Sequence, residues 1–561
     1  MKSLLGIVGA ALLVILLLFA CTPQPGMVAG WVLDTQEQPI TGAVVRIKAS
    51  NLAAKTDADG YFQLLDIPAN QPLFVTAWSP GYYINGLDSI QPGSMDLRIV
   101  LQAHHDSDNP GYAWLPSIQF SGEGEAQGCA ECHSREGSDL SFTLPVDEWL
   151  LDAHSQSAVN PRFLTMYSGT DVEGNRSPLT RYNYSRDYGR FPLRPDPNQP
   201  YFGPGYKLDF PDTAGNCAAC HTPAAAIDAA YGVNPTSVSG VAREGIPCDF
   251  CHKVWNVILD PATGLPFANM PGVLSFEFRR PPEGHQFFAG PFDDVAPGED
   301  TFTPIQRESQ YCAPCHFGIF WDTVIYNSFG EWLESSYSDP ESGQTCQDCH
   351  MPPLGATHFA LPDQGGVARD PQTIFSHFMP GASSADLLQA SVSMDVSATR
   401  AADQLTVSVT IVNDQTGHHV PTDSPLRHMI LLVQAESADG APLTQIGGQT
   451  IPEYAGVGDP NLGYYAGLPG KVFAKILMEL WTEITPTGSY WNPTVIVSDN
   501  RLAAFEADTS DYVFSISQDD GDAEVSVTAT LLFRRAFKEL MDQKGWDVPD
   551  IVMQQVNLKV R

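Results

Sequence analysis

Basic side chains are scarce in this chain of 561 residues, which has 30 lysines and arginines against 65 aspartates and glutamates. The formal net charge is −35 with histidine counted as neutral. A chain this acidic repels nucleic-acid phosphates, so we expect no nucleic-acid partner. The shortage of lysine and arginine also argues against a polybasic membrane surface. Partners attracted by charge are therefore expected to be positively charged patches on other proteins, or cationic substrates.

Cysteine is almost absent outside one repeated pattern. Ten of the eleven cysteines lie in five copies of Cys-x-x-Cys-His, numbered here as motifs 1 to 5: Cys129-Ala-Glu-Cys132-His133, Cys217-Ala-Ala-Cys220-His221, Cys248-Asp-Phe-Cys251-His252, Cys312-Ala-Pro-Cys315-His316 and Cys346-Gln-Asp-Cys349-His350. This is the attachment pattern of c-type haem, in which two thiols bond one porphyrin and the adjacent histidine binds the iron. The sequence therefore predicts five covalently bound haem c groups, each with its motif histidine as proximal ligand.

Other uses of paired cysteines fit this pattern less well. A zinc ribbon uses two Cys-x-x-Cys pairs and needs no histidine directly after each second cysteine. A thioredoxin-like site needs one such pair in a βαβ unit, and a disulfide framework has no reason to repeat a single spacing five times. Haem therefore remains the favoured interpretation, with zinc or disulfides as the alternatives.

Each iron has a second axial position, and nine histidines remain to fill it: His104, His105, His154, His285, His358, His377, His418, His419 and His428. Nine candidates for five positions predict bis-histidine haems of low spin and low potential. The candidates ranked first, by flanking aromatic or turn residues and by position between motifs, are His154, His377, His418, His419 and His285. Methionine at one or two irons, for example Met166 or Met379, is the alternative. Motifs 2 and 3, and motifs 4 and 5, are separated by the shortest intervals, so those haems are expected to form close pairs.

The amino terminus reads as an export signal. A basic start is followed by an apolar run from Leu4 to Ala20. Leu18-Phe19-Ala20-Cys21 resembles a bacterial lipobox, so residues 1–20 are expected to be a signal peptide, Cys21 to carry lipid, and residues 21–26 to form a tether. The alternative is an uncleaved anchor. Both readings predict an exported protein that is held at a membrane on its periplasmic or extracellular side.

Residues 27–103 are predicted to form a small β-domain, because short apolar strands alternate with turns at residues 36–39 and 56–60. An Asp57 and Asp59 calcium site is the alternative to a plain turn. Four pieces of this segment resemble the carboxypeptidase regulatory-like domain: Gly30-x-Val32, Pro39-Ile40-x-Gly42-Ala43-x-Val45, Asp59-Gly60-x-Phe62 and Pro80-Gly81-Tyr82. The resemblance implies a transthyretin-like β-sandwich that serves adhesion, spacing or partner contact.

Residues 104–385 contain all five motifs and are predicted to be a mostly α-helical and irregular domain packed around haem. Proline and glycine are frequent there, and porphyrins can replace side chains as the core, so only short helices are expected to carry the motifs. Residues 386–561 return to β-structure, because apolar residues alternate at 392–396 and 405–411 and recur at 429–433 and 525–531. We predict an immunoglobulin-like sandwich with a terminal helix, in which Phe533, Phe537, Leu540 and Met541 face inward and Arg534, Arg535 and Lys538 face outward.

The haem region, about residues 125–435, resembles multihaem cytochromes of the cytochrome c-552/c-554 type. The residues that carry the resemblance are Gly245-Ile246-Pro247 with Cys248 to Lys253, Tyr326 to Trp332, Thr345 to Pro352, and the turn Thr416 to Thr422. The resemblance implies haems in packed and perpendicular pairs and electron transfer outside the cytoplasm. The chain departs from ammonia-forming nitrite reductase, because no motif here has lysine in place of histidine.

Three hypotheses follow from this sequence. The first is an electron carrier between other redox proteins or extracellular electron acceptors. The second is an oxidoreductase that acts on a small nitrogen or sulfur compound at one open haem, with Arg181, Tyr182 and Arg186 as the polar groups to test. The third is a protomer of a cytochrome filament, in which a histidine of one copy reaches a haem of the next.

Overall fold

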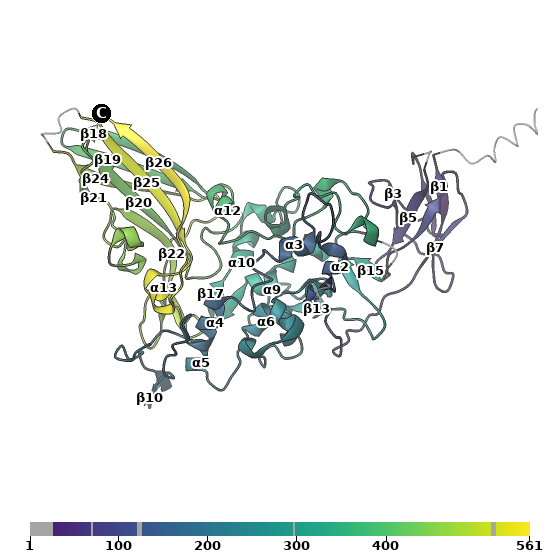
Figure 1. The fold of residues 1–561 in the computed structure, drawn as a ribbon, viewed down its shortest axis with the longest axis horizontal. Coiled ribbons are helices and arrows are strands. Elements are labelled where there is room, and N and C mark those ends of the chain that lie inside the picture. Colours follow the sequence, from purple (N-terminus) through teal and green to yellow (C-terminus); the bar gives the residue numbers. More distant parts are fainter. Residues whose placement is uncertain (1–25, 69–70, 121–125, 296–297, 518–522) are drawn as a thin grey trace, which may run out of the picture.

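The computed structural model describes residues 26–68, 71–120, 126–295, 298–517 and 523–561. The chain runs from N-terminal β-sheets through a central irregular region with short helices to C-terminal antiparallel sheets, which lie at the opposite end of the molecule (Figure 1). The predicted signal peptide and the lipid site at Cys21 lie outside the described residues. Among the described residues, the helices are too short or too polar to span a membrane.

The N-terminal part consists of two sheets, with the strand orders β4-β1-β7 and β3-β2-β5-β6. Their bounds are β1 (Val28–Asp34), β2 (Val44–Ile47), β3 (Ala53–Lys55), β4 (Tyr61–Leu64), β5 (Leu73–Trp78), β6 (Asn85–Ile90) and β7 (Leu97–Leu101). Val32 and Phe62 of the first sheet share one buried core with Val45 and Val75 of the second. The β-structure predicted for this segment is confirmed, with β1 and β7 parallel. The Asp57 carboxylate accepts hydrogen bonds from backbone amides within its own turn.

Two adjacent aspartates join the N-terminal sheets to the central region. The Arg46 Nε atom lies 2.8 Å from Asp293 Oδ1, and the backbone amide of Ala49 donates to Asp294 at 2.7 Å. Asp294 also forms a buried ion pair with Arg369 at 2.8 Å. These contacts fix the first sheet pair against the motif-bearing part of the chain.

The central region contains helices of at most eight residues, joined by short strand pairs and 3-10 turns. Its helices are α2 (Ala130–His133), α3 (Pro145–Trp149), α4 (Pro161–Ser168), α5 (Tyr206–Asp209), α6 (Ala218–His221), α7 (Pro223–Ala226), α8 (Cys248–Cys251), α9 (Ala313–His316), α10 (Ser328–Leu333), α11 (Cys346–His350) and α12 (Ala385–Ala390). Its strands are β8 (Gln119–Phe120), β9 (Ala126–Gln127), β10 (Tyr182–Ser185), β11 (Gly189–Pro192), β12 (Val254–Val257), β13 (Phe276–Phe278), β14 (Phe288–Gly290), β15 (Asp300–Phe302), β16 (Gly318–Phe320) and β17 (Thr323–Tyr326). The 3-10 turns of this region are η1 (Pro235–Ser237), η2 (Gly240–Glu244), η3 (Gly272–Ser275), η4 (Pro304–Arg307), η5 (Ser309–Tyr311), η6 (Ser336–Ser338), η7 (Pro362–Gln364) and η8 (Pro371–Thr373).

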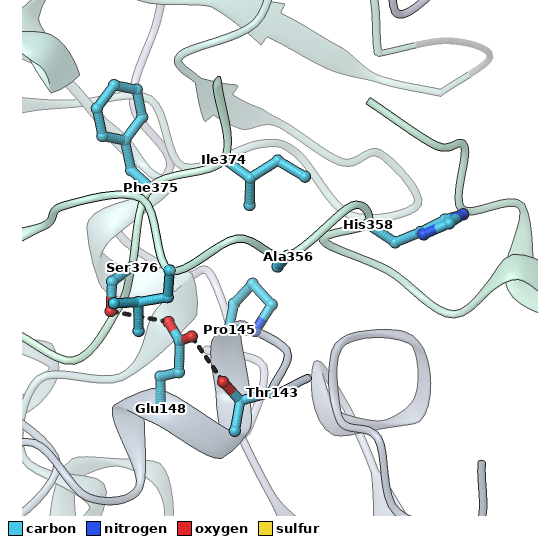
Figure 2. Close-up of a pocket in the computed structure, with 9 residues that line it drawn as sticks. Thr143, Pro145, Glu148, Ala356, His358, Ile374, Phe375 and Ser376 are labelled. Atoms are coloured by element: carbon cyan, nitrogen blue, oxygen red, sulfur yellow. Dashed lines mark hydrogen bonds between the residues drawn. The ribbon is translucent and has the colours of Figure 1, made fainter. Parts of the chain in front are cut away.

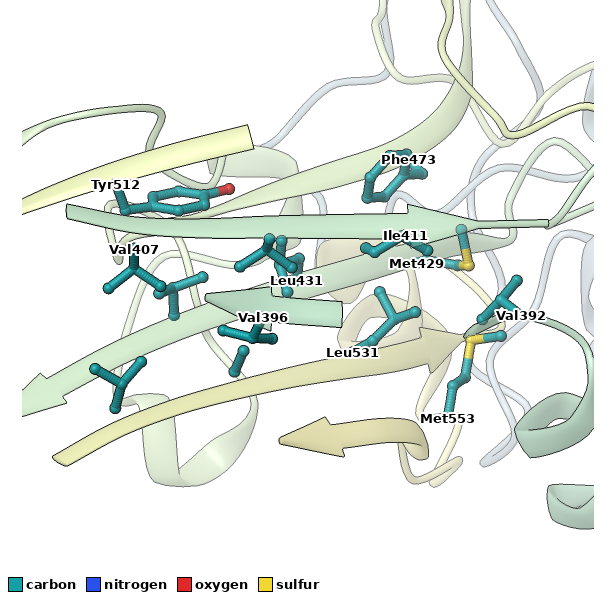
Figure 3. Close-up of a cluster of buried hydrophobic side chains, with 14 of the residues drawn as sticks. Val392, Val396, Val407, Ile411, Met429, Leu431, Phe473, Tyr512, Leu531 and Met553 are labelled. Atoms are coloured by element: carbon teal, nitrogen blue, oxygen red, sulfur yellow. The ribbon is translucent and has the colours of Figure 1, made fainter. Parts of the chain in front are cut away.

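The C-terminal part has two antiparallel sheets, ordered β18-β19-β24-β21 and β23-β22-β20-β25-β26. Their bounds are β18 (Ser393–Ala401), β19 (Gln404–Val412), β20 (His428–Glu436), β21 (Thr444–Gly447), β22 (Gly470–Glu479), β23 (Thr494–Asp499), β24 (Ala507–Ser515), β25 (Val525–Arg534) and β26 (Ile551–Val560), with turns η9 (Glu453–Ala455) and η10 (Pro460–Leu462). Side chains from both sheets, including Val407, Leu431 and Tyr512, meet in one buried cluster (Figure 3). The four predicted apolar strands are confirmed.

The prediction of a terminal helix is wrong in two respects: the helix begins later than predicted, and a strand follows it. Phe533 and Arg534 end strand β25, α13 covers Lys538–Lys544, and β26 follows it to pair with β25. Arg534 is 2% exposed rather than outward, because its guanidinium pairs with Asp550 at 2.7 Å and donates to two backbone carbonyls. The apolar residues at helical spacing therefore belong to two elements, a strand and a helix.

Candidate haem attachment sites

Each motif lies on or directly beside a helix of four or five residues, which confirms the predicted short helices. Three motif histidines have the same orientation, because the ring Nδ1–H donates to a backbone carbonyl oxygen and leaves Nε2 free. A histidine held in this way presents Nε2 to a metal, and the hydrogen bond fixes the tautomer. The pairs are His133 with Phe359, His252 with Ala289 and His350 with Pro380, each at 2.7 Å.

The motif histidines of motifs 2 and 4 have different surroundings. The His316 Nδ1 atom lies 3.7 Å from an Asp423 carboxylate oxygen. The His221 ring stacks on Phe163 of α4, with ring centres 3.7 Å apart and an angle of 6°. Its Nδ1 atom is buried and has no hydrogen-bond partner among the described residues. The histidine of motif 2 thus packs against an aromatic side chain, whereas the histidines of motifs 1, 3 and 5 donate a hydrogen bond to a backbone carbonyl.

Two predicted distal histidines each lie opposite a motif histidine, with the same distance between ring centres in both pairs. The ring centres of His350 and His418 are 6.2 Å apart with an angle of 17°, and those of His316 and His154 are 6.2 Å apart with an angle of 77°. Metal–imidazole bonds are about 2.0 Å long, so two imidazoles on opposite sides of one iron have centres about 6 Å apart. Each pair therefore leaves the space that one iron needs.

The rings of His154 and His418 are also oriented by their second nitrogen. The His154 Nδ1–H donates to the buried Asp152 carboxylate at 2.6 Å. The His418 Nδ1–H donates to the backbone oxygen of His419 at 2.9 Å. Both hydrogen bonds leave Nε2 as the free nitrogen, as in the three motif histidines described above.

His377 is held by a buried carboxylate that joins two distant segments. The Glu148 side chain of α3 accepts from the backbone amide of His377 at 2.7 Å, from the Ser376 hydroxyl and from the Thr143 hydroxyl. Figure 2 shows Glu148 between Thr143 and Ser376. Burial, with a smaller contribution from the neighbouring His133, lowers the pKa of His377 to about 4. His377 is thus half-buried near motif 1.

His285 and His419 face carboxylates. His285 Nδ1 lies 2.8 Å from Glu299, and its ring centre is 4.9 Å from that of His105. His419 Nδ1 lies 3.5 Å from Glu331. In the part of the chain that the structure describes, neither ring contacts a motif histidine.

Three histidines outside the candidates ranked first, His104, His105 and His428, have buried Nε2 atoms without a hydrogen-bond partner among the described residues. His104 packs edge-on against Trp255 and Phe287, with ring centres 4.9 and 5.5 Å away. His428 stacks on Phe537 at 5.1 Å. No local pattern in the sequence marks these positions, because the aromatic neighbours of His104 and His428 come from remote segments.

The remaining sequence candidates lie elsewhere. Met166 is buried in the hydrophobic cluster that includes residues of α13. Arg181 and Arg186 are exposed, and the Tyr182 hydroxyl donates to the backbone oxygen of Asp209 at 2.8 Å. The hairpin β10–β11 that follows Arg181 lies at the margin of the molecule (Figure 1).

Cysteines of different motifs adjoin one another. Cys248 raises the pKa of the Cys129 thiol, Cys220 raises that of Cys315, and Cys346 raises that of Cys312, so the two thiols of each pair lie close together. These contacts connect motif 1 with 3, motif 2 with 4, and motif 4 with 5. The expected proximity of motifs 4 and 5 is thus present. Motifs 2 and 3 share a hydrophobic cluster through helices α6 and α8, although their thiols contact other motifs.

Comparisons with known proteins place the fold. No family model and no curated protein matches the sequence. A solved penta-heme cytochrome c552 from Thermochromatium tepidum is similar over 77% of this chain and 97% of its own, with a TM-score of 0.50 and 18% identity. Two cohesin–X-dockerin complexes of Acetivibrio cellulolyticus match only short stretches. One covers 14% of this chain and 58% of its own at 20% identity, and the other covers 16% and 66% at 19% identity. Their TM-scores of 0.13 and 0.14 are too low to indicate a shared fold. The fold therefore resembles that of a multihaem cytochrome c552.

Proposed function

We propose that this protein is an exported pentahaem c-type cytochrome that carries electrons between redox partners. The observation that carries the proposal is the fivefold Cys-x-x-Cys-His motif on short helices, within a fold that resembles a multihaem cytochrome. Bound haem supplies the one-electron chemistry, and the chain supplies ligation, spacing and exclusion of water. Three motif histidines already have the orientation that this role needs.

Three histidines are proposed as distal ligands. The spacing of the rings favours His418 opposite His350, and His154 opposite His316. His377 is proposed for motif 1 or motif 3, because its charge acts on the histidines of both. His285 and His419 are weaker candidates, since a carboxylate lies beside each ring.

The cysteine contacts support an order of transfer between haems. Thioether bonds lie at the porphyrin edge, so adjoining cysteines bring the edges of two porphyrins together. Cys251 of motif 3 also lies in electrostatic range of Cys312 and Cys315 of motif 4. We propose a path from motif 1 through motif 3 to motif 4, with motifs 2 and 5 as branches from motif 4.

Location and partners complete the proposal. A lipid on Cys21 would hold the protein at a membrane on the periplasmic or extracellular side, and the N-terminal sheets, with their carboxypeptidase regulatory-like pattern, would contact neighbours. The net charge of −35 favours redox proteins with basic docking patches, or extracellular acceptors, over nucleic acid. Assembly into a cytochrome filament stays the alternative, in which an unassigned histidine such as His285 reaches the haem of a second copy.

Film voltammetry of the purified protein on an electrode tests the carrier against the enzyme. We expect reversible uptake of five electrons per chain and no sustained catalytic current when nitrite, hydroxylamine or tetrathionate is added. A catalytic current that grows with substrate concentration would contradict the carrier function and support the oxidoreductase.

A further inference from the structure

Basic residues are scarce in this chain, yet four arginines gather on one hairpin. Strands β10 and β11 form this hairpin, and the backbone amide of Leu193 donates to the carbonyl oxygen of Arg181 at 2.8 Å, which closes its base. The segment 181–194 contains four of the 30 basic residues and one of the 65 acidic residues, Asp187. All four arginines are exposed: Arg181, Arg186, Arg190 and Arg194. The hairpin is therefore a basic surface on a strongly acidic protein.

Packing against the loop between β22 and β23 holds the hairpin in place. The ring centre of Trp481 in this loop lies 5.6 Å from that of Tyr188 and 5.9 Å from that of Phe191. The Arg194 guanidinium donates to the backbone oxygen of Thr482 at 2.5 Å. A two-stranded hairpin alone is marginally stable in water, so these contacts stabilise it. A surface that is ordered in advance loses less entropy when a partner binds.

The two faces of the hairpin differ. Side chains alternate between the faces along each strand, and Tyr184 stands directly opposite Arg190. Tyr182 lies two residues before Tyr184 on the same face, and the Arg190 guanidinium lies 3.9 Å from the centre of its ring. Phe191 lies on the opposite face, which contacts Trp481. The face with the two tyrosines is thus left without a covering element, and an open depression there is lined by Thr180, Tyr182, Asn183, Tyr184 and Arg190.

Large aromatic side chains are exposed beside these arginines. Tyr184 is 72% exposed, Tyr188 is 69% exposed and Trp481 is 42% exposed. Tyrosine, tryptophan and arginine are the residue types enriched in the energetically important parts of protein–protein interfaces, and exposed apolar patches mark interaction sites. The composition of this surface therefore favours a protein partner. Its charge favours an acidic one, because potentials across an interface are complementary.

Two short helices, α5 and α4, connect the hairpin with motif 2. A tyrosine hydroxyl of β10 donates to the backbone oxygen of Asp209 at the end of α5. At the start of α5, Tyr206 stacks on Tyr167 of α4, with ring centres 5.5 Å apart. Phe163 of the same helix stacks on the His221 ring at 3.7 Å. Packed aromatic rings thus lead from the hairpin to the second attachment site.

We propose that the hairpin β10–β11 is the docking surface for an acidic redox protein, which exchanges electrons with this chain at motif 2. The proposal rests on the proposed carrier function and names the chemistry of one partner. The net charge of −35 suits basic partners for the body of the protein, whereas the hairpin suits an acidic one, so two partners can dock at different places. The hairpin lies on the side of the molecule away from the N-terminal sheets (Figure 1). A lipid on Cys21 would hold those sheets at the membrane and leave the hairpin facing away from it.

Stopped-flow kinetics of the haem-loaded full chain tests the proposal with two probe proteins, an acidic plant-type ferredoxin and a basic mitochondrial cytochrome c. Reduced ferredoxin loses one electron to the oxidised protein, and oxidised cytochrome c gains one from the reduced protein. On net charge alone, ferredoxin and this chain repel each other, so their second-order rate constant would rise with ionic strength. Docking at the hairpin predicts the opposite sign. The rate constant is expected to fall between about 10 and 150 mM salt, because screening weakens the local attraction.

Charge reversal locates the docking surface. The double variant Arg186→Glu with Arg190→Glu is expected to slow reduction by ferredoxin about tenfold or more at low salt and to leave the reaction with cytochrome c unchanged. The matched control is Lys55→Glu with Arg98→Glu, which reverses two exposed charges on the N-terminal sheets and gives the same net charge. This control is expected to react with ferredoxin like the wild type. The salt dependence of the wild type needs no variant, so the test stands even where a variant fails to fold.

Three results would overturn the proposal. A ferredoxin rate constant that rises with ionic strength would mean that net charge alone governs the encounter. Equal slowing in the two double variants would mean a general charge effect without a docking surface. Binding of polygalacturonate to the wild type but not to the hairpin variant, with equal ferredoxin rates in both, would assign the hairpin to an anionic polysaccharide.

Failure of the docking surface and failure of the carrier function give different results. Loss of the five-electron wave in the voltammetry above contradicts the carrier. An intact wave, together with an unchanged ferredoxin rate in the hairpin variant, contradicts the docking surface alone.

Discussion

His418 and His419 are adjacent in the chain but meet different surroundings. The ring of His418 faces His350, whereas His419 turns toward Glu331. The sequence singled out both, because a tandem pair in a turn gives no indication of which ring points to the haem region. It identified the motif histidines more sharply, since covalent attachment fixes their position relative to two cysteines. Distal histidines depend on contacts between remote segments, and no local pattern encodes those.

Alanine substitution of the two neighbours tests this assignment. We expect His418→Ala to keep five haems, because the thioether bonds and His350 remain, and to convert one of them to a high-spin ferric iron with an open axial position. His419→Ala should leave the spin states unchanged. Electron paramagnetic resonance of the oxidised proteins measures both, and a high-spin signal in His419→Ala alone would reverse the assignment.

At the scale of elements, the turn that carries His418 is fixed to helix α10 by one buried carboxylate. Glu331 accepts from the Thr422 hydroxyl and pairs with Arg501 at 2.8 Å, where the two side chains are 1% and 6% exposed. The sequence predicted the flanking strands from their alternation, but it did not reveal this contact, because Glu331 and Arg501 are 170 positions apart. A buried ion pair of this kind sets the position of the turn relative to the motifs.

Arg501→Met is expected to destabilise the protein by about 3–5 kcal/mol, because it leaves the Glu331 charge buried without its partner. The double variant Glu331→Gln with Arg501→Met should recover most of that loss. Chemical denaturation of the three proteins measures the free energies of unfolding. Equal losses in the single and double variants would show that the ion pair does not hold the turn.

Over the whole molecule, the sequence predicted the succession of β-structure, motif-bearing region and β-structure, because apolar alternation and cysteine spacing are local patterns. It failed at residues 533–541, where apolar residues at helical spacing span the end of β25 and the start of α13. The sequence also did not predict the order of the motifs in space. Motif 2 contacts motif 4 through Cys220 and Cys315 across a long stretch of chain, and packing around the haem sites decides such contacts.

The proposed function depends most on covalently bound haem, and the pyridine haemochrome assay of the purified protein tests this directly. We expect a c-type absorption band and five haems per chain, one for each Cys-x-x-Cys-His motif. A colourless protein, or one with zinc between its cysteines and no haem, would contradict the electron-transfer function.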